Sequence, residues 1–252
     1  MRLKDRVVLI TGGGTGMGRA AAVLFAREGA GVAVNYSRSR DEAEEVVAQI
    51  RSEGGKAIAI QASVAKEPEV IAMMRRVEEE FGRLDALINN AGWTHRVAHE
   101  KLDELTDDIW DQTLDVNLRG VFYCVRAAAP LLRKQEGSSI VNNASVAALT
   151  GSGSSIVYAA AKAGVATMTM SLARALAPQI RVNAVAPGSV RTQFANWPAE
   201  MYEKALTRIP LQRLPTVDDV AYAMLYLVAE ARSTTGEMLL VDGGLTRLGP
   251  RA

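Results

Sequence analysis

Tyr158 and Lys162 stand four residues apart in a run of small apolar residues. On a helix this spacing places both side chains on one face, about 5–6 Å apart at Cβ. A phenol has a reference pKa of about 10, too high for proton exchange near neutrality, and we expect a neighbouring ammonium to lower it. Ser145 ends a strand-like run and can donate a hydrogen bond to the same substrate oxygen. These types and spacings predict general acid–base chemistry at a carbonyl or hydroxyl group.

A glycine-rich loop follows the first strand-like run, Val7 to Ile10, and opens a helix-like run. Such a loop presents backbone N–H groups and a helix N-terminus to a pyrophosphate. The spacing Gly-x-x-x-Gly-x-Gly differs from the common Gly-x-Gly-x-x-Gly, and no Gly-Lys-Ser/Thr follows, which excludes a P-loop. A glycine-rich turn without a ligand remains the alternative. The residues expected at the pyrophosphate are Gly12, Thr15, Gly16, Met17 and Gly18.

The end of the second strand-like run, Val32 to Val34, should distinguish NAD from NADP. A carboxylate there binds the 2′-hydroxyl of NAD, whereas a cation accommodates the 2′-phosphate of NADP. The segment Asn35-Tyr-Ser-Arg-Ser-Arg40 has no carboxylate. We therefore favour NADP(H) over NAD(H), with Ser37 and Arg38 as its ligands. We assign Ser39 to a capping box with Glu42.

Strand-like runs alternate with helix-like runs along the whole chain, which predicts βαβ units, a parallel sheet and helices on both faces. We expect one doubly wound (Rossmann) α/β domain over residues 1–252 with a central seven-stranded sheet. The irregular stretch 191–216 is expected to be a substrate-loop insertion. Predicted helices and strands are 7–10, 19–27, 32–34, 41–53, 56–60, 69–81, 84–88, 109–132, 139–142, 156–176, 180–185, 217–229 and 238–241.

The composition argues against several classes of partner and site. Among 252 residues, Lys and Arg number 29 and Asp and Glu 28, and a net charge of +1 argues against nucleic acid or an acidic membrane surface. A single cysteine, Cys124, excludes an internal disulfide, and two histidines argue against a metal centre. We find no signal peptide and no apolar run near the roughly 20 residues that span a bilayer. A cytoplasmic protein is expected.

The chain resembles the short-chain dehydrogenase/reductase family over nearly its whole length. The resemblance rests on the Thr11–Gly18 loop, Asn89-Asn-Ala-Gly92, Asn117, Ser145, Tyr158-x-x-x-Lys162 and Pro187-Gly188. It implies that Tyr158 is the general acid or base, that Ser145 polarises the substrate oxygen, and that Lys162 lowers the tyrosine pKa and holds the nicotinamide ribose. It also implies that Asn117 positions a relay water. Further cofactor contacts implied are Asn90, Ala91, Gly92, Pro187, Gly188, Val190 and Thr192.

One position departs from the family pattern. Ser63-Val64 stands where family members commonly have Asp-Val against the adenine, so we expect Ser63 and Val64 to contact it more weakly. Asn89, Cys124 and Asp242 are interpreted as structural residues. Family members are usually homotetramers, and we expect the same here.

The substrate is less defined by the sequence. We expect an apolar pocket suited to medium-sized ketones or secondary alcohols. Its walls would come from Trp93, Thr94, His95, Ala147, Leu149 and Gly151, and its lid from Phe194, Trp197 and Met201. Three alternatives stay open: a 3-oxoacyl-acyl-carrier-protein reductase, an NAD-dependent secondary-alcohol or steroid dehydrogenase, and a cofactor-sensing protein without turnover.

Overall fold

Seven parallel strands form one sheet in the order β3-β2-β1-β4-β5-β6-β7. The computed structural model describes residues 1–194 and 197–251. The strands are β1 (Val7–Ile10), β2 (Gly31–Tyr36), β3 (Ala57–Gln61), β4 (Ala86–Asn89), β5 (Ser138–Asn143), β6 (Ile180–Pro187) and β7 (Met238–Val241). The predicted doubly wound α/β sheet is confirmed.

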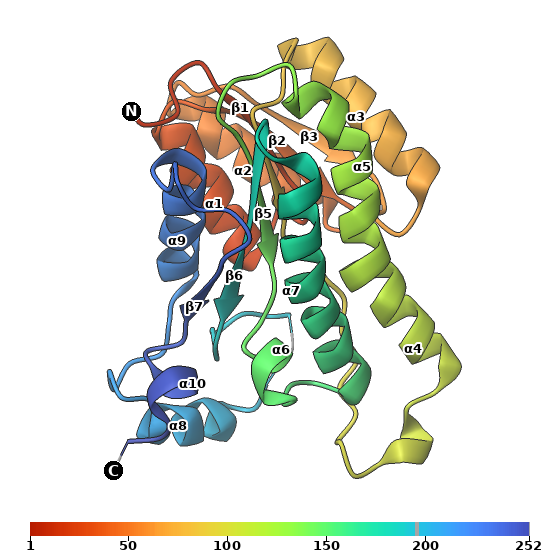
Figure 1. Cartoon of the computed structure of the whole chain (residues 1–252), viewed down its shortest axis with the longest axis vertical. Helices are drawn as coiled ribbons and strands as arrows, with labels where there is room; N and C mark the ends of the chain where they lie inside the picture. Colours follow the sequence, from red (N-terminus) through yellow and green to blue (C-terminus); the bar gives the residue numbers. More distant parts are fainter. Residues whose placement is uncertain (195–196, 252) are drawn as a thin grey trace.

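Helices cover both faces of this sheet (Figure 1). One face carries α1 (Gly16–Arg27), α2 (Arg40–Ser52) and α9 (Val217–Ala229). The other carries α3 (Glu67–Phe81), α5 (Gly120–Leu132) and α7 (Ile156–Leu176). The remaining helices are α4 (Asp107–Leu114), α6 (Ala147–Thr150), α8 (Ala199–Arg208) and α10 (Leu245–Leu248), with a 3₁₀ turn at Leu102–Glu104.

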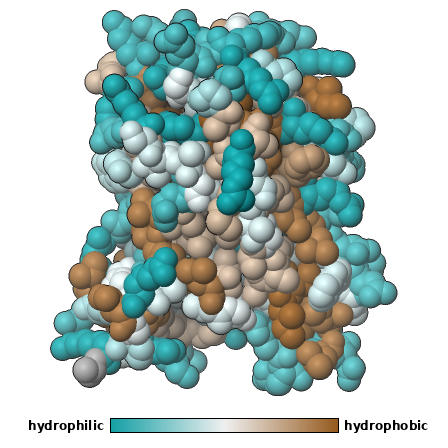
Figure 2. Space-filling model, viewed as in Figure 1, coloured by the Kyte–Doolittle hydropathy of each residue, from teal (hydrophilic) through white to brown (hydrophobic). Residues whose placement is uncertain are grey.

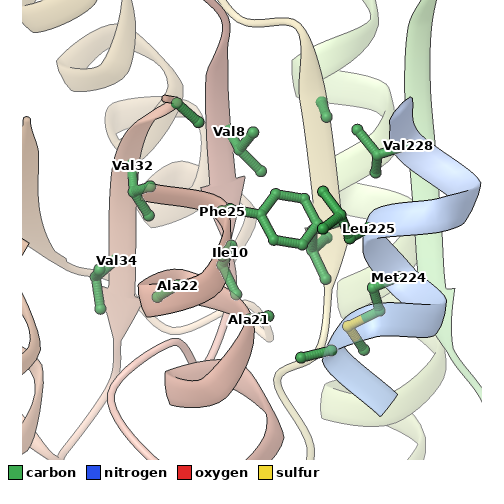
Figure 3. Packing of buried hydrophobic residues seen from close by; sticks show 14 of the residues in the cluster. Val8, Ile10, Ala21, Ala22, Phe25, Val32, Val34, Met224, Leu225 and Val228 are labelled. Atoms are coloured by element: carbon green, nitrogen blue, oxygen red, sulfur yellow. The ribbon is translucent and has the colours of Figure 1, made fainter. Parts of the chain in front are cut away.

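Strand alternation explains the two cores. In β1, Val8 and Ile10 face one apolar cluster, and Val7 and Leu9 face the other. Figure 3 shows Phe25 of α1 between β1 and α9, where it is fully buried. Burying such a side chain contributes about 1.5–3 kcal/mol. An apolar residue on both faces of a strand therefore requires helices on both sides of the sheet.

The direction in which successive strands are added to the sheet reverses between β1 and β4, while the strands themselves stay parallel. From β1 the sheet grows through β2 to β3, and from β4 it grows the other way through β5 to β7. The carboxyl ends of the strands on either side of this switch point are where open α/β sheets hold ligands. The fold thus places the glycine loop after β1 and the Asn90 segment after β4 at one crevice.

The predicted helix 109–132 is not a single α-helix. Asp115–Arg119 form a π-helical turn between α4 and α5. Such a turn adds a residue to the helical repeat and is frequent at functional sites. Hydrophobic periodicity does not reveal it, because both flanking segments keep an ordinary helical pattern.

The capping box expected at Ser39 and Glu42 needs correction. Ser39 is the N-cap of α2, but its hydroxyl makes no capping hydrogen bond and lines a cleft instead. The capping box forms at α9, where Thr216 and Asp219 bond reciprocally. The stretch 191–216 contains a regular helix, α8, and its residues 195–196 lie outside the described part of the chain.

Helix α7 is long and apolar enough to cross a membrane by length and composition. By this criterion, the expectation that no apolar run approaches that length is wrong for α7. The helix packs against β6, α6 and α4, and it contains the buried Lys162. Its apolar character is accounted for in part by this packing.

Candidate active site

A cleft of about 1340 Å³ opens at the carboxyl ends of the strands. Every predicted catalytic or cofactor-binding residue lines it except Gly18 and Asn117. The lining set is Gly12, Thr15, Gly16, Met17, Ser37, Arg38, Ser63, Val64, Asn90, Ala91, Gly92, Ser145, Tyr158, Lys162, Pro187, Gly188, Val190 and Thr192. Segments that are far apart in the sequence therefore meet at a single surface.

The glycine loop is shaped by close backbone contacts. Gly12 has a φ of +61°, which favours glycine. A Cβ on Gly18 would lie 2.2 Å from the carbonyl oxygen of Gly12, so no side chain fits there. Gly18 thus allows α1 to approach the loop and does not itself face the cleft. By contrast, a Cβ on Gly16 would meet only Thr192, at 3.6 Å, so this part of the loop is open to the cleft.

Asn90 ties the glycine loop to β4. Its Nδ2 donates to the carbonyl oxygens of Thr11, at 3.1 Å, and Gly12, at 3.0 Å. The Thr11 hydroxyl oxygen accepts from the backbone N–H groups of Asn90 and Ala91 at 2.9 and 3.0 Å. The side chain of Asn90 is therefore committed to holding the loop, although the residue also lines the cleft.

At the β2 end of the cleft, Ser37 and Arg38 are exposed. Arg38 forms no ion pair within residues 1–194 and 197–251. Its guanidinium is thus available to an anion, and a guanidinium can bind phosphate oxygens bidentately.

Next to this end, Ser63 follows β3. Its backbone N–H donates to the Glu69 carboxylate at 2.7 Å. This hydrogen bond, together with Lys66, lowers the pKa of Glu69. Sequence reasoning missed Glu69, and only its position six residues after Ser63, in the first turn of α3, could have indicated a cap for the loop.

At the other end of the cleft lie Ser145, Tyr158 and Lys162. Helix α7 begins with Ser155 as its N-cap, and the Ser155 hydroxyl accepts from the backbone N–H of Tyr158 at 3.2 Å. This start of the helix fixes where Tyr158 and Lys162 face. The Lys162 Nζ donates to the carbonyl oxygen of Asn143 at 2.6 Å and lies 5.7 Å from the centre of the Tyr158 ring.

The electrostatics differ from the expectation. Burial raises the pKa of Tyr158 to about 12, and a hydrogen bond with Ser145 opposes that rise. Burial lowers the pKa of Lys162 to about 8. The expected lowering of the tyrosine pKa by Lys162 is not found, because the ammonium is bonded to the β5 carbonyl and burial has the larger effect. In this state, Tyr158 is a neutral phenol at neutral pH.

Asn117 lies in the π-helical turn and is fully buried. Its side-chain oxygen accepts from the Trp93 N–H at 3.0 Å, and its Nδ2 donates to the Trp93 carbonyl at 2.7 Å. Both polar groups of the amide are therefore used to hold the segment after β4. The structure does not bring Asn117 to the cleft wall beside Ser145 and Tyr158.

The substrate wall is more polar than expected. Trp93, Phe194 and Trp197 line the cleft, and the Phe194 ring lies 6.2 Å from that of Tyr158. Of the other predicted wall and lid residues, Ala147 lines the cleft and Thr94, His95, Leu149, Gly151 and Met201 do not. Trp93 stacks on His95, with 6.3 Å between ring centres. Sequence reasoning missed Ser152, Gly153, Ser154 and Tyr202.

The three residues interpreted as structural are placed accordingly. The Asn89 Nδ2 donates to Asn142 at 2.9 Å inside the core. The Asp242 carboxylate accepts from the N–H groups of Gly244 and Thr246 at 2.8 and 2.7 Å, in the turn before α10. Burial raises the pKa of Cys124 to about 12, so its thiol is unreactive near neutrality.

Comparisons with known proteins agree with this architecture. The family model described as "Enoyl-(Acyl carrier protein) reductase" matches residues 12–246. The chain is 41% identical to the 3-oxoacyl-[acyl-carrier-protein] reductase FabG of Staphylococcus aureus over 240 residues, which cover 94% of this chain and 96% of that protein.

Solved structures give the same result. A short-chain dehydrogenase from Burkholderia cenocepacia, in complex with NADP, is 40% identical, with a TM-score of 0.90 over 96% of this chain and 98% of that one. Levodione reductase is 32% identical, with a TM-score of 0.90 over 98% and 99%. Fold, motifs and similarity together establish that this chain belongs to the short-chain dehydrogenase/reductase family of oxidoreductases.

Proposed function

We propose that this protein reduces a medium-sized ketone to a secondary alcohol with NADPH, and also catalyses the reverse oxidation. The observation that carries the proposal is the cleft itself. The Ser145–Tyr158–Lys162 group stands at one end, and the Arg38 guanidinium, which has no ion-pair partner among the described residues, stands at the other. The NADP bound by the Burkholderia cenocepacia relative supports the choice of cofactor.

The residues present fit a phosphorylated dinucleotide. The open backbone around Gly16 and the N-terminus of α1 would hold the pyrophosphate. Arg38 and Ser37 would bind the 2′-phosphate, and Ser63 and Val64 would contact the adenine. Pro187, Gly188, Val190 and Thr192 would hold the nicotinamide end. Asn143, which lines the same cleft, has a buried Oδ1 that lacks a hydrogen-bond partner among the described residues.

When bound, NADPH would supply the hydride for the carbonyl carbon, and the protein supplies position and a proton. Ser145 would donate a hydrogen bond to the carbonyl oxygen. Tyr158 would transfer its proton to that oxygen as the carbon–oxygen double bond is reduced. A pKa of about 12 keeps Tyr158 protonated beforehand, so the site is prepared for the reductive direction.

Lys162 would stabilise the phenolate that remains on Tyr158. Its pKa of about 8 leaves it mostly an ammonium at pH 7. In the oxidative direction the same phenolate would accept the alcohol proton. Asn117 would act through Trp93, whose backbone it holds, by positioning the segment that forms one wall of the site.

Two narrower substrate assignments are supported by different observations. Similarity to the Staphylococcus aureus reductase supports a 3-oxoacyl thioester, whereas similarity to levodione reductase supports a cyclic ketone. We favour a free ketone, because the segment Gln135-Glu136-Gly137 before β5 lacks the basic cluster that an acidic carrier protein would favour. Phe194 and Trp197, which belong to the stretch 191–216, would provide an apolar surface over the bound ketone.

A homotetramer is proposed for the assembly. Figure 2 shows apolar surface along the flank where α4 and α5 lie in Figure 1. Trp110 of α4 and Phe122 of α5 are each 40% exposed there. An apolar flank of this kind is typical of a subunit interface. Light scattering after gel filtration would measure the mass of the assembly. We expect the protein to lie in the cytoplasm.

The central test is NADPH oxidation followed by absorbance with a panel of ketones and 3-oxoacyl thioesters. We expect turnover with cyclic or medium-sized ketones, and faster turnover with NADPH than with NADH. Preference for NADH would select the secondary-alcohol dehydrogenase alternative. Cofactor binding without turnover of any carbonyl compound would instead select the cofactor-sensing alternative.

A further inference from the structure

Asn143 is the last residue of β5 and is 7% exposed, yet the proposed chemistry gives its side chain no role. Its carbonyl oxygen accepts from the Lys162 Nζ at 2.6 Å. Its Nδ2 donates to the Asn90 Oδ1 at 3.0 Å. Its own Oδ1 is buried and has no hydrogen-bond partner among residues 1–194 and 197–251, and the residue as a whole lines the cleft.

The neighbouring hydrogen bonds fix the orientation of this amide. Asn90 uses its Nδ2 on the carbonyl oxygens of Thr11 and Gly12, so its Oδ1 can only accept. Asn143 must therefore turn its NH₂ group toward Asn90. A rotated amide would set two carbonyl oxygens against each other. The Oδ1 of Asn143 is consequently directed away from Asn90.

The hydrogen bond to Asn90 accounts for the Nδ2 of this amide but not for its Oδ1, and the apolar packing of β5 does not require an amide here. Two residues earlier on the same face of β5, Val141 packs in the apolar core with Ile88 and Val185. An aliphatic side chain at 143 would continue that face. A buried amide with one unsatisfied oxygen costs free energy unless another donor completes it.

We propose that Asn143 is a positioning residue for the nicotinamide half of the dinucleotide, with its Oδ1 as the acceptor. The inference rests on the proposed binding of NADP(H) in this cleft. The nicotinamide riboside carries two kinds of donor, ribose hydroxyl groups and a carboxamide NH₂. Either kind would satisfy the Oδ1.

This placement connects Lys162 and the glycine loop through a single residue. The main chain of Asn143 holds Lys162, and its side chain holds Asn90, which in turn holds the glycine loop. A cofactor bonded to the Oδ1 would thus stabilise the orientation of the Asn143 side chain. That residue is connected to Lys162 through its main chain and to the glycine loop through Asn90.

The test compares Asn143→Leu with Asn89→Leu. Each substitution removes one buried Oδ1 at nearly constant volume, and each also removes one hydrogen bond from Nδ2, to Asn90 or to Asn142. Asn89 is a matched control: it is 3% exposed and its Oδ1 is also buried without a partner in the described chain, but it does not line the cleft. The dissociation constant of NADPH is measured by fluorescence titration. We expect it to rise about 10-fold in Asn143→Leu, as for one lost hydrogen bond. We expect a change of less than about twofold in Asn89→Leu.

If Asn143→Leu does not fold, Asn143→Ala removes the same oxygen without an apolar branch. Titration with 3-acetylpyridine adenine dinucleotide phosphate, which lacks the carboxamide NH₂, distinguishes the two donors. For a carboxamide bond the analogue binds wild type and variant equally, and for a ribose bond the variant weakens both nucleotides. Unchanged NADPH affinity in the folded variants, or an equal loss in Asn89→Leu, overturns the inference alone. Failure of the wild type to bind NADPH overturns the proposed function as well.

Discussion

Replacing Arg38 with alanine should weaken NADPH binding much more than NADH binding. The guanidinium lines the cleft, is exposed and has no ion-pair partner within the described chain. A charge-assisted hydrogen bond contributes about 1.5–3 kcal/mol, and screening by solvent reduces this for an exposed group. A loss of about 1.5–2 kcal/mol corresponds to a dissociation constant roughly 10- to 30-fold higher for NADPH. NADH has no 2′-phosphate and should bind the variant with nearly unchanged affinity.

The matched control is Arg40→Ala. Arg40 is two residues away, exposed and equally charged, but it begins α2 and does not line the cleft. Isothermal titration of both cofactors against wild type and the two variants, at low and high salt, gives six affinities at each salt concentration. The difference between Arg38→Ala and wild type should shrink as salt screens the pair. Equal losses for NADPH and NADH, or equal effects of the two substitutions, would refute the assignment of Arg38 to the 2′-phosphate.

Tyr158→Phe should lower the rate of ketone reduction by about 10²- to 10⁴-fold, because the proton donor is lost, while the NADPH dissociation constant changes little. Stopped-flow measurements give the rate and fluorescence titration gives the dissociation constant. Near-normal turnover would contradict the assignment of Tyr158 as the proton donor. For Lys162, the folded pKa of about 8 lies below the ordinary 10.5, so the unfolded chain binds more protons between these values and stability should rise with pH across that range. Urea denaturation of wild type minus Lys162→Met should show a relative gain of about 1–2 kcal/mol between pH 8.5 and 10, and a relative loss would be the wrong sign. Gly18→Ala should destabilise the protein by about 1–3 kcal/mol and weaken NADPH binding, because its Cβ would fall 2.2 Å from the Gly12 carbonyl; an unchanged melting temperature would show that α1 can move away.

The sequence predicted the order and type of the principal helices and strands because each carries its own signal. The β-branched runs and amphipathic runs alternate, and closely spaced glycines after a first strand are typical of a phosphate-binding loop. Local spacing also predicted that Tyr158 and Lys162 share a helix face. These features depend on residues close in the sequence, so a single chain suffices to identify them.

What the sequence could not predict depends on the choice of partner in space. Asn117 was expected to position a relay water, and the sequence did not identify the hydrogen-bond partner of its amide, the backbone of Trp93, which lies 24 positions earlier. Lys162 was expected to lower the pKa of Tyr158, but its Nζ bonds to the carbonyl of Asn143. The hydrogen bond from the Ser63 N–H to Glu69 likewise depends on how the loop after β3 packs against α3, and the spacing of the two residues gives only a weak indication of it. Each of these side chains had several chemically acceptable partners, and only the assembled sheet selects among them.

In a regular helix, the orientation of α5 would fix the orientation of the residues before it, including Asn117. The π-helical turn at Asp115–Arg119 makes these two orientations independent. One extra residue rotates everything before it by about 100° relative to everything after it. Deleting one residue there would restore an unbroken α-helix and leave the core contacts of α5 in place, but it would swing Asn117 away from Trp93. A shortening of this kind is therefore the smallest change that would keep the scaffold while releasing one wall of the pocket, which makes this turn a natural starting point for altering substrate range.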